Sequence, residues 1–256
     1  MFVCGVDGCR GGWVGVLLAG TISSVKIRVF PDIQALWDAW RNATCILIDI
    51  PIGLREGGPA PRECDAIARQ ILRWPRSSSI FPVPCRAAIY ASTYKTACTI
   101  NREKTAKGVS KQAWNIIPKI RQVDVLLCNT PSARQVIRES HPELCFWALG
   151  GGRTTMHYKK TLAGMEERFQ ILECLYPGAK SIVEEAQTFH SRDAAGIDDI
   201  IDAMALAISA YLAKGKLDSI PINPECDAKG LPMEMCFFRV TGTGKNLFPI
   251  SMKSLS

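Results

Sequence analysis

The N-terminal part of the chain consists of apolar runs with the spacing of β-strands. Residues 2–6 and 13–19 form two short apolar runs separated by a glycine-rich turn, which predicts a hairpin. In residues 23–30, apolar and polar side chains alternate, as expected for a strand with one exposed face. Three consecutive strands are therefore expected at the start of the chain.

A helix and a buried strand are expected next. Residues 33–40 place large apolar side chains at positions i, i+3, i+4 and i+7, the spacing of one face of a helix. Residues 44–50 are apolar on both faces, which is typical of a central parallel strand. Pro51 ends this run directly after Asp49.

The following segment, residues 53–130, does not continue the alternation of strands and helices. Its pattern predicts a mostly helical insertion with a proline-broken loop, and within it a helix over residues 112–123 that is kinked at Pro118.

After the insertion, the pattern predicts one more strand and two strong helices. The strand covers residues 136–140 and carries Glu139, and a helix is expected around residues 162–172. The last helix opens at Asp198 and is apolar nearly all round, so it is expected to lie in the interior. The order β-β-β-α-β-α-β-α is that of an α/β protein with the ribonuclease H-like fold, a five-stranded mixed sheet.

Composition narrows the class of protein. The chain has 256 residues, of which 47% are hydrophobic and 21% charged, so we expect residues 1–256 to form one globular domain with its insertion. No apolar stretch reaches the roughly 18 residues of a membrane span, so no membrane partner is expected. The N-terminus lacks the basic segment of a signal peptide. We therefore expect a cytoplasmic protein with reduced cysteines.

The net charge is +7 at neutral pH. Arginines and lysines are frequent between Arg62 and Lys111, a distribution compatible with a polyanionic partner such as nucleic acid. Nothing in the sequence opposes a homodimer.

Acidic residues stand where the predicted elements meet. Asp7 follows the first strand, Asp49 follows the fourth, and Asp199 and Asp202 lie three residues apart at the start of the last helix. Each has an ordinary explanation, since Asp7 and Gly8 form a common turn dipeptide and acids favour helix starts. Asp49 is harder to explain in this way, because an isolated carboxylate after an apolar strand is costly to bury.

Together these four acids predict a metal site. Mg²⁺, or Mn²⁺ in its place, prefers hard oxygen ligands, and two such ions can activate water and stabilise the leaving oxygen of a phosphodiester. The predicted function is therefore metal-dependent phosphodiester hydrolysis.

Several segments resemble a known family, a domain-of-unknown-function family of predicted ribonuclease H-like nucleases. They are residues 5–14 (GVDGCRGGWV), 48–53 (IDIPIG), 62–65 (RECD), 76–82 (RSSSIFP), 112–116 (QAWNI) and 139–143 (ESHPE). The resemblance covers the chain from end to end and implies a nuclease. It also implies that Glu139 corresponds to the family's fifth-strand acid, as a fourth ligand or as a base beside the metal.

The last helix is similar to the closing helix of Holliday-junction resolvases, in which two acids at this spacing bind metal. By that resemblance, Asp7, Asp199 and Asp202 are metal ligands and catalytic residues. Asp49 takes the position where the resolvases have a glutamate, so the metal geometry is expected to differ.

Substrate contacts are expected in the insertion. The candidates are Arg62, Arg69, Arg73, Arg76, Ser77 and Ser78, which offer guanidinium and hydroxyl groups to phosphates. An insertion loop anchored by Phe81 explains the segment after Arg76 equally well. His141 and His190 are more simply structural than catalytic.

Two alternatives to a nuclease remain open at this stage. A nucleic-acid-binding or nucleotide-binding module of the same fold needs no turnover. A phosphoryl-transferring ATPase is less compatible, because such enzymes use two domains of this kind and the sequence has strands for one. The sequence contains no base-reading motif that would identify the substrate as DNA, RNA or a branched junction.

Overall fold

The structure is a computed structural model, and it describes residues 2–20, 25–189 and 194–240. At its centre is a five-stranded sheet in the order β3-β2-β1-β4-β5. The strands are β1 (Phe2–Cys9), β2 (Gly12–Ala19), β3 (Val25–Phe30), β4 (Cys45–Ile48) and β5 (Ile137–Glu139). β1, β2 and β3 form an antiparallel meander, whereas β4 and β5 run parallel to β1. This topology confirms the predicted ribonuclease H-like fold.

Helices cover both faces of the sheet and fill the connection between β4 and β5. They are α1 (Ile33–Trp40), α2 (Glu63–Leu72), α3 (Arg86–Ile89), α4 (Tyr94–Thr105), α5 (Lys111–Asn129), α6 (Pro131–Val136), α7 (Pro142–Leu149), α8 (Leu162–Leu175), α9 (Ala179–Phe189) and α10 (Ile197–Ala213). A short 3-10 helix, η1 (Arg76–Ser79), follows α2. The helical insertion between β4 and β5 is confirmed.

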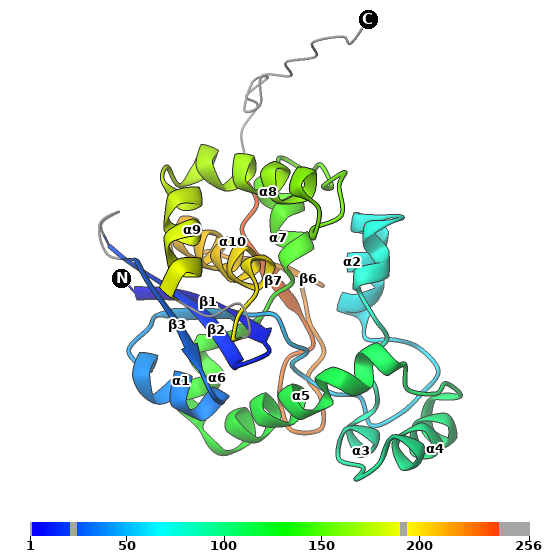
Figure 1. Ribbon diagram of the computed structural model, residues 1–256. Helices are drawn as coiled ribbons and strands as arrows, with labels where there is room; N and C mark the ends of the chain where they lie inside the picture. The colour runs from blue at the N-terminus through cyan, green and yellow to red at the C-terminus, as the bar shows by residue number, and fades with distance from the viewer. Residues whose placement is uncertain (1, 21–24, 190–193, 241–256) are drawn as a thin grey trace, which may run out of the picture.

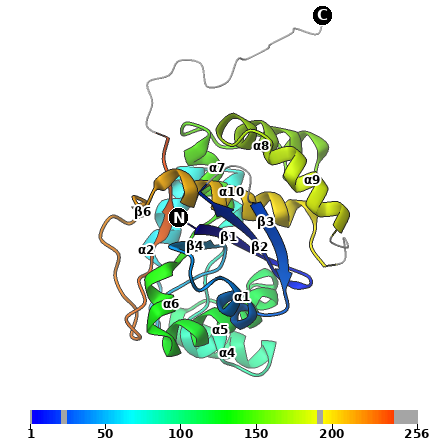
Figure 2. The same cartoon turned by 90° about the vertical axis from the view of Figure 1, so that its left-hand side faces the viewer.

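The sheet separates two apolar cores because successive side chains of a strand point to opposite faces. Cys4 and Val6 of β1 pack into the core that contains α1 and α5, whereas Val3 packs into the core that contains α10. Figures 1 and 2 show α8, α9 and α10 on one side of the sheet and α1 and α5 on the other. α10 is buried along nearly its whole length, as its apolar pattern predicted.

Several details differ from the sequence prediction, among them α7 and α9, which were not expected, and β4 and β5, which are shorter than the predicted strands. β1 continues to Cys9, because its pairing with β2 extends to the tip of the hairpin. α5 runs from Lys111 to Asn129 and retains Pro118 inside, since its buried apolar face offsets the lost backbone hydrogen bond. A second, two-stranded sheet of β6 (Asp218–Ile220) and β7 (Met235–Phe237) was not predicted. Residues 23 and 24 of the predicted third strand lie outside the described residues.

Candidate functional site

Two of the predicted acids lie side by side on adjacent strands. β1 and β4 pair with Val6 opposite Ile48, and the Asp49 amide donates a hydrogen bond to the Val6 carbonyl oxygen over 2.9 Å. Asp49 is therefore the neighbour of Asp7 across the sheet. Asp7 is buried, and its Oδ1 accepts a hydrogen bond of 2.6 Å from the Gly8 amide.

The alternative explanation of Asp7 as a turn residue is wrong. Asp7 pairs with Val14 and Gly8 with Trp13, so both residues lie within the paired strands. The turn itself is at residues 10–11. A buried carboxylate in a central strand needs a different explanation, because burial without a partner is costly.

α10 brings the next acid to these two because it packs directly on β1. Gly5 lies on the same face of β1 as Asp7, and a Cβ at Gly5 would lie 2.0 Å from the Ala203 carbonyl oxygen and 2.2 Å from the Ala207 nitrogen. Only glycine permits this approach. The side chain of Asp202, on the first turns of α10, is consequently buried against the strand ends.

The other two acids of α10 have roles at the start of the helix. Asp199 accepts a hydrogen bond of 3.0 Å from the Gly196 amide and so caps α10. The carboxylate of Asp198 lies 3.6 Å from the Lys160 ammonium. Asp199 is half-buried and still close enough for its charge to raise the pKa of Asp7.

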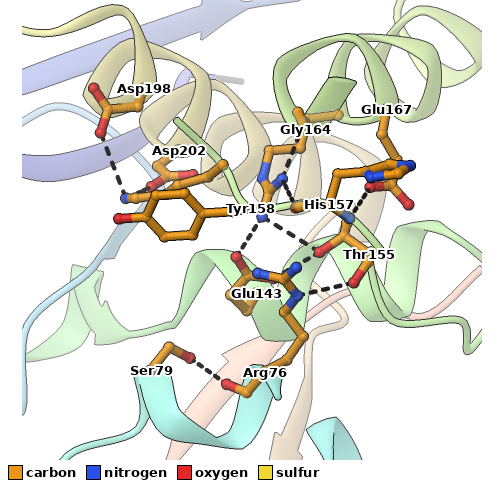
Figure 3. Close-up of polar contacts among 12 residues, drawn as sticks. Arg76, Ser79, Glu143, Thr155, His157, Tyr158, Gly164, Glu167, Asp198 and Asp202 are labelled. Atoms are coloured by element: carbon orange, nitrogen blue, oxygen red, sulfur yellow. Dashed lines mark hydrogen bonds and ion pairs between the residues drawn. The ribbon is translucent and has the colours of Figure 1, made fainter. Parts of the chain in front are cut away.

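A lysine that the sequence analysis did not single out lies against Asp202. Lys159 Nζ is 2.6 Å from Asp202 Oδ2 and 4.0 Å from Asp198 Oδ2. Figure 3 shows Asp198 and Asp202 on the same side of α10, with Tyr158 beside them. Burial alone would lower the pKa of Lys159, but the carboxylates of Asp202 and Asp7 raise it above its usual value.

Burial raises the pKa of all three converging acids, Asp7, Asp49 and Asp202, which we call the carboxylate cluster. The pKa of Asp7 is raised well above its usual value, first by burial and then by Asp49 and Asp202. Burial raises the pKa of Asp202 to about 6 despite the Lys159 ammonium. The pKa of Asp49 is raised by burial, although His141 and Lys159 oppose the shift. Mutually repelling buried acids of this kind are typical of functional sites.

Glu139 lies in a separate buried network. Arg62 Nη2 is 2.6 Å from Asp65 Oδ1 and 2.7 Å from Glu139 Oε1, and the Ile52 amide donates to Glu139 Oε2 over 2.6 Å. Cys64, Asp65 and Glu139 have ligand atoms within 4.8 Å of one another and could hold a metal ion. In the structure, the Arg62 guanidinium supplies the positive charge between the two carboxylates.

A cavity of about 650 Å³ opens beside the carboxylate cluster. Its walls come from the strand ends, η1, α5 and the loop before α8. The lining includes Asp7, Asp49, Asp202, Glu139, His141, Lys119, Lys159, Tyr158, Phe81, Arg76, Ser78 and Ser79. The volume lies within the roughly 300–1,000 Å³ of small-molecule sites in proteins.

The six residues predicted to contact substrate do not form one surface. Arg62 is buried in the network with Glu139, whereas Arg69 and Arg73 are exposed on or just after α2. Ser77 and Ser78 lie in η1, and the Ser78 hydroxyl donates to the Pro75 carbonyl oxygen over 2.6 Å. Ser78 and Arg62 line the cavity.

Arg76 joins η1 to a distant loop. Its Nε and Nη2 donate hydrogen bonds of 2.9 Å to the carbonyl oxygens of Thr155 and Met156. The carboxylate of Glu167 accepts hydrogen bonds from the Met156 and His157 amides over 2.7 and 2.9 Å, which holds the same loop from its other side (Figure 3). Arg76 is thus part of a cavity wall.

The two histidines considered in the sequence have different outcomes. His141 lines the cavity, and its Nδ1 accepts a hydrogen bond of 3.2 Å from the Glu143 amide, which caps α7. His190 lies outside the described residues.

Comparison with known proteins places the chain in a family. The model of the family described as "Protein of unknown function (DUF429)" matches residues 5–226. The chain belongs to this DUF429 family. No match was found among curated proteins or among solved structures. The matched DUF429 segment contains every member of the carboxylate cluster and also Lys159.

No local pattern in this DUF429 sequence distinguishes Lys159 from other lysines. It stands in an irregular loop after Gly151 and Gly152, next to another lysine, so neither periodicity nor a motif distinguishes it. The sequence does contain an indirect signal: Asp202 lies on a helix predicted to be buried, and a buried carboxylate needs a cationic partner.

Within the described part of this DUF429 protein, no helix is both long and apolar enough to cross a membrane.

Proposed function

We propose that the protein is a metal-dependent nuclease that hydrolyses phosphodiester bonds, with Mg²⁺ or Mn²⁺ held by Asp7, Asp49 and Asp202. The observation that carries this proposal is that three carboxylates line one cavity: Asp7 of β1 and Asp202 of α10, which are buried, and Asp49 at the end of β4, which is half-buried. The ribonuclease H-like fold is compatible with such an enzyme.

The donor set fits a hard divalent cation. Carboxylate oxygens are the ligands that Mg²⁺ prefers, and it usually takes one or two of them together with water and substrate phosphate. Lys159 supplies one positive charge to three carboxylates, so the cluster retains an excess of negative charge when all are ionised. Bound ions would activate the attacking water and stabilise the leaving oxygen.

The remaining residues of the site position this cluster. Asp199 caps α10 and adds negative charge beside Asp7, which makes it a further candidate ligand. Lys159 holds the carboxylate of Asp202 and partly neutralises it. Glu139 holds the Ile52 amide and Arg62, so we assign it a positioning role.

A nucleic-acid partner is supported by charge. The chain carries a net charge of +7. Arg69 of α2, which also donates a hydrogen bond to the Ile80 carbonyl oxygen, and Arg73, just after α2, are exposed and offer guanidinium groups to phosphates. Nucleic acid is thus the partner that we propose for this cavity.

The decisive experiment is a cleavage assay with labelled single-stranded, duplex, hybrid and four-way-junction substrates, with and without Mg²⁺ or Mn²⁺. Cleavage that requires metal and is lost in Asp7→Asn supports the nuclease. Binding without cleavage across the whole panel would favour a binding module of the same fold. Release of phosphate from ATP would instead favour a phosphoryl-transfer enzyme.

A further inference from the structure

We propose that the cavity beside the carboxylate cluster takes a single unpaired nucleoside phosphate, as the end of a single strand or as a free nucleotide, and excludes base-paired duplex. This inference rests on the proposed function and adds the class of substrate.

The size of the cavity favours a single nucleotide. A volume of about 650 Å³ lies within the roughly 300–1,000 Å³ of pockets that hold one small molecule, so the cavity has room for one nucleotide and not for both strands of a base-paired segment. Because Asp7, Asp49 and Asp202 line this space, the bond to be cleaved must enter it. A phosphate at the end of a single strand or on a free nucleotide can enter such a space, because no second strand accompanies it.

The part of the cavity wall that η1 forms is held in place by hydrogen bonds to the loop before α8. Arg76 of η1 donates two hydrogen bonds of 2.9 Å to the backbone of Thr155 and Met156. Glu143 accepts a hydrogen bond of 2.9 Å from the Thr155 hydroxyl and pairs with buried Arg168 (Figure 3). Two segments distant in sequence are thereby clipped together, and opening the cavity into a duplex-sized groove would break these bonds.

The lining of the cavity offers groups that suit a base and a phosphate. The Tyr158 side chain is 59% exposed and lines the cavity beside Lys159, and Phe81 contributes a second ring. Stacking on aromatic rings is the usual sequence-tolerant way to hold an unpaired base. Positive charge on the lining comes from Lys159, which is paired with Asp202, and from Lys119, whose Nζ donates to the carbonyl oxygens of Cys9 and Gly12 over 3.1 and 2.6 Å. The rings suit the base of one nucleotide and the lysines suit its phosphate, and both lie beside the acids proposed to hold the metal.

The test measures binding with Ca²⁺ in place of Mg²⁺, which neutralises the carboxylate cluster without promoting hydrolysis, so that the result does not depend on turnover. The probes are fluorescein-labelled single-stranded dT12, fluorescein-labelled UMP and a labelled blunt-ended hairpin duplex, and binding is followed by fluorescence anisotropy. We expect the single strand to bind at least about tenfold more tightly than the duplex. We also expect Tyr158→Ala to weaken its binding about tenfold, the effect of losing one stacked base.

Matched variants keep this test specific. Tyr158→Phe retains the ring and should bind normally, and Phe189→Ala removes a 77% exposed ring on α9 and should change nothing. If dT12 fails to bind but fluorescein-labelled UMP binds, the ligand of the cavity is a free nucleotide and the inference stands. Equal affinity for duplex and single strand, unchanged binding by Tyr158→Ala, or no binding of either nucleotide probe would overturn it.

These outcomes are separable from those of the proposed function. A protein that binds dT12 through Tyr158 but cleaves nothing with Mg²⁺ or Mn²⁺ would refute the nuclease and leave the inference standing. Metal-dependent cleavage of an intact blunt duplex as fast as of a single strand would refute the inference and leave the nuclease standing.

Discussion

At the scale of single residues, the main question is whether Asp7 serves stability or function. It is buried, its neighbours Asp49 and Asp202 are also acids, and its pKa is raised by burial and by both. A residue kept under such repulsion costs stability without a cation, which is the pattern expected of a functional group.

Asp7→Asn is therefore expected to separate the two roles. The metal-free variant should melt at the same temperature as the wild type or higher, because one repelling charge is removed. Its stabilisation by Mg²⁺ and its hydrolytic activity should both be lost. Thermal melts with and without Mg²⁺, beside the cleavage assay, measure this. Asp38→Asn, on the exposed side of α1, is the matched control and should behave as wild type.

If Asp7→Asn still cleaves its substrate and is still stabilised by Mg²⁺ in thermal melts, Asp7 is neither a metal ligand nor a catalytic residue.

Arg62, in contrast to Asp7, serves the stability of the fold. Its side chain is 2% exposed and forms ion pairs with Asp65 and Glu139. Arg62→Met leaves both buried carboxylates without their partner and should cost about 3–5 kcal/mol of unfolding free energy in urea titrations. Arg41→Met, at the exposed end of α1, should change stability by less than about 0.5 kcal/mol. A loss below about 1 kcal/mol for Arg62→Met would show that this network is not structural.

At the scale of elements, the contact of α10 with β1 positions the site. Gly5→Ala would place a methyl group 2.0 Å from the Ala203 carbonyl oxygen, so the helix must shift away from the strand. We expect a loss of about 3 kcal/mol or more in urea unfolding. We also expect a weaker thermal response to Mg²⁺, because Asp202 moves with the helix. Gly20→Ala meets no atom within 4 Å and is the control.

A Gly5→Ala protein with unchanged stability and metal response would disprove this close contact.

α2 offers a test of the proposed phosphate contacts. Replacing Arg69 and Arg73 by glutamine should weaken binding of a single-stranded oligonucleotide. It should also reduce the slope of log K against log salt by roughly 0.7 per lost contact. Titrations at several salt concentrations measure the slope. An unchanged slope would place the binding surface elsewhere, for example at the exposed Lys160.

At the scale of the whole molecule, the raised pKa values set the dependence of stability on pH. Burial raises the pKa of Asp202 to about 6 and that of Glu139 to about 7, above their usual values of 3.8 and 4.5. The folded state therefore binds more protons than the unfolded state between these values. The stabilisation of the folded state by protonated Asp202 and Glu139 is therefore complete below about pH 4 and is lost as the pH rises through 6 to 7.

The melting temperature of the metal-free protein should accordingly fall between pH 5 and 7 in a series of thermal melts. Asp7→Asn should reduce this fall, and saturating Mg²⁺ should reduce it by binding the ionised acids. A melting temperature that rises steadily over this range would contradict the raised pKa values.

The topology of the central sheet follows from the pattern of apolar residues alone. Apolar periodicity gave the strand and helix order, because a half-buried strand and a buried helix impose different spacings. The parallel pairing of β1 with β4 then followed from the ribonuclease H-like order, and it made Asp7 and Asp49 neighbours. The position of Asp202 on a buried helix was also visible in the pattern of α10.

Which polar groups meet depends on how the whole chain packs. Glu139 pairs in register with Ile48, so strand alternation turns it to the face opposite to that of Asp49, and it meets Arg62 instead. Lys159 reaches Asp202 from a loop 43 residues away, a separation that no local pattern encodes. Local spacing fixes which side of an element a residue occupies, whereas long-range partners are chosen by packing of the whole chain, and the cavity is made by such partners.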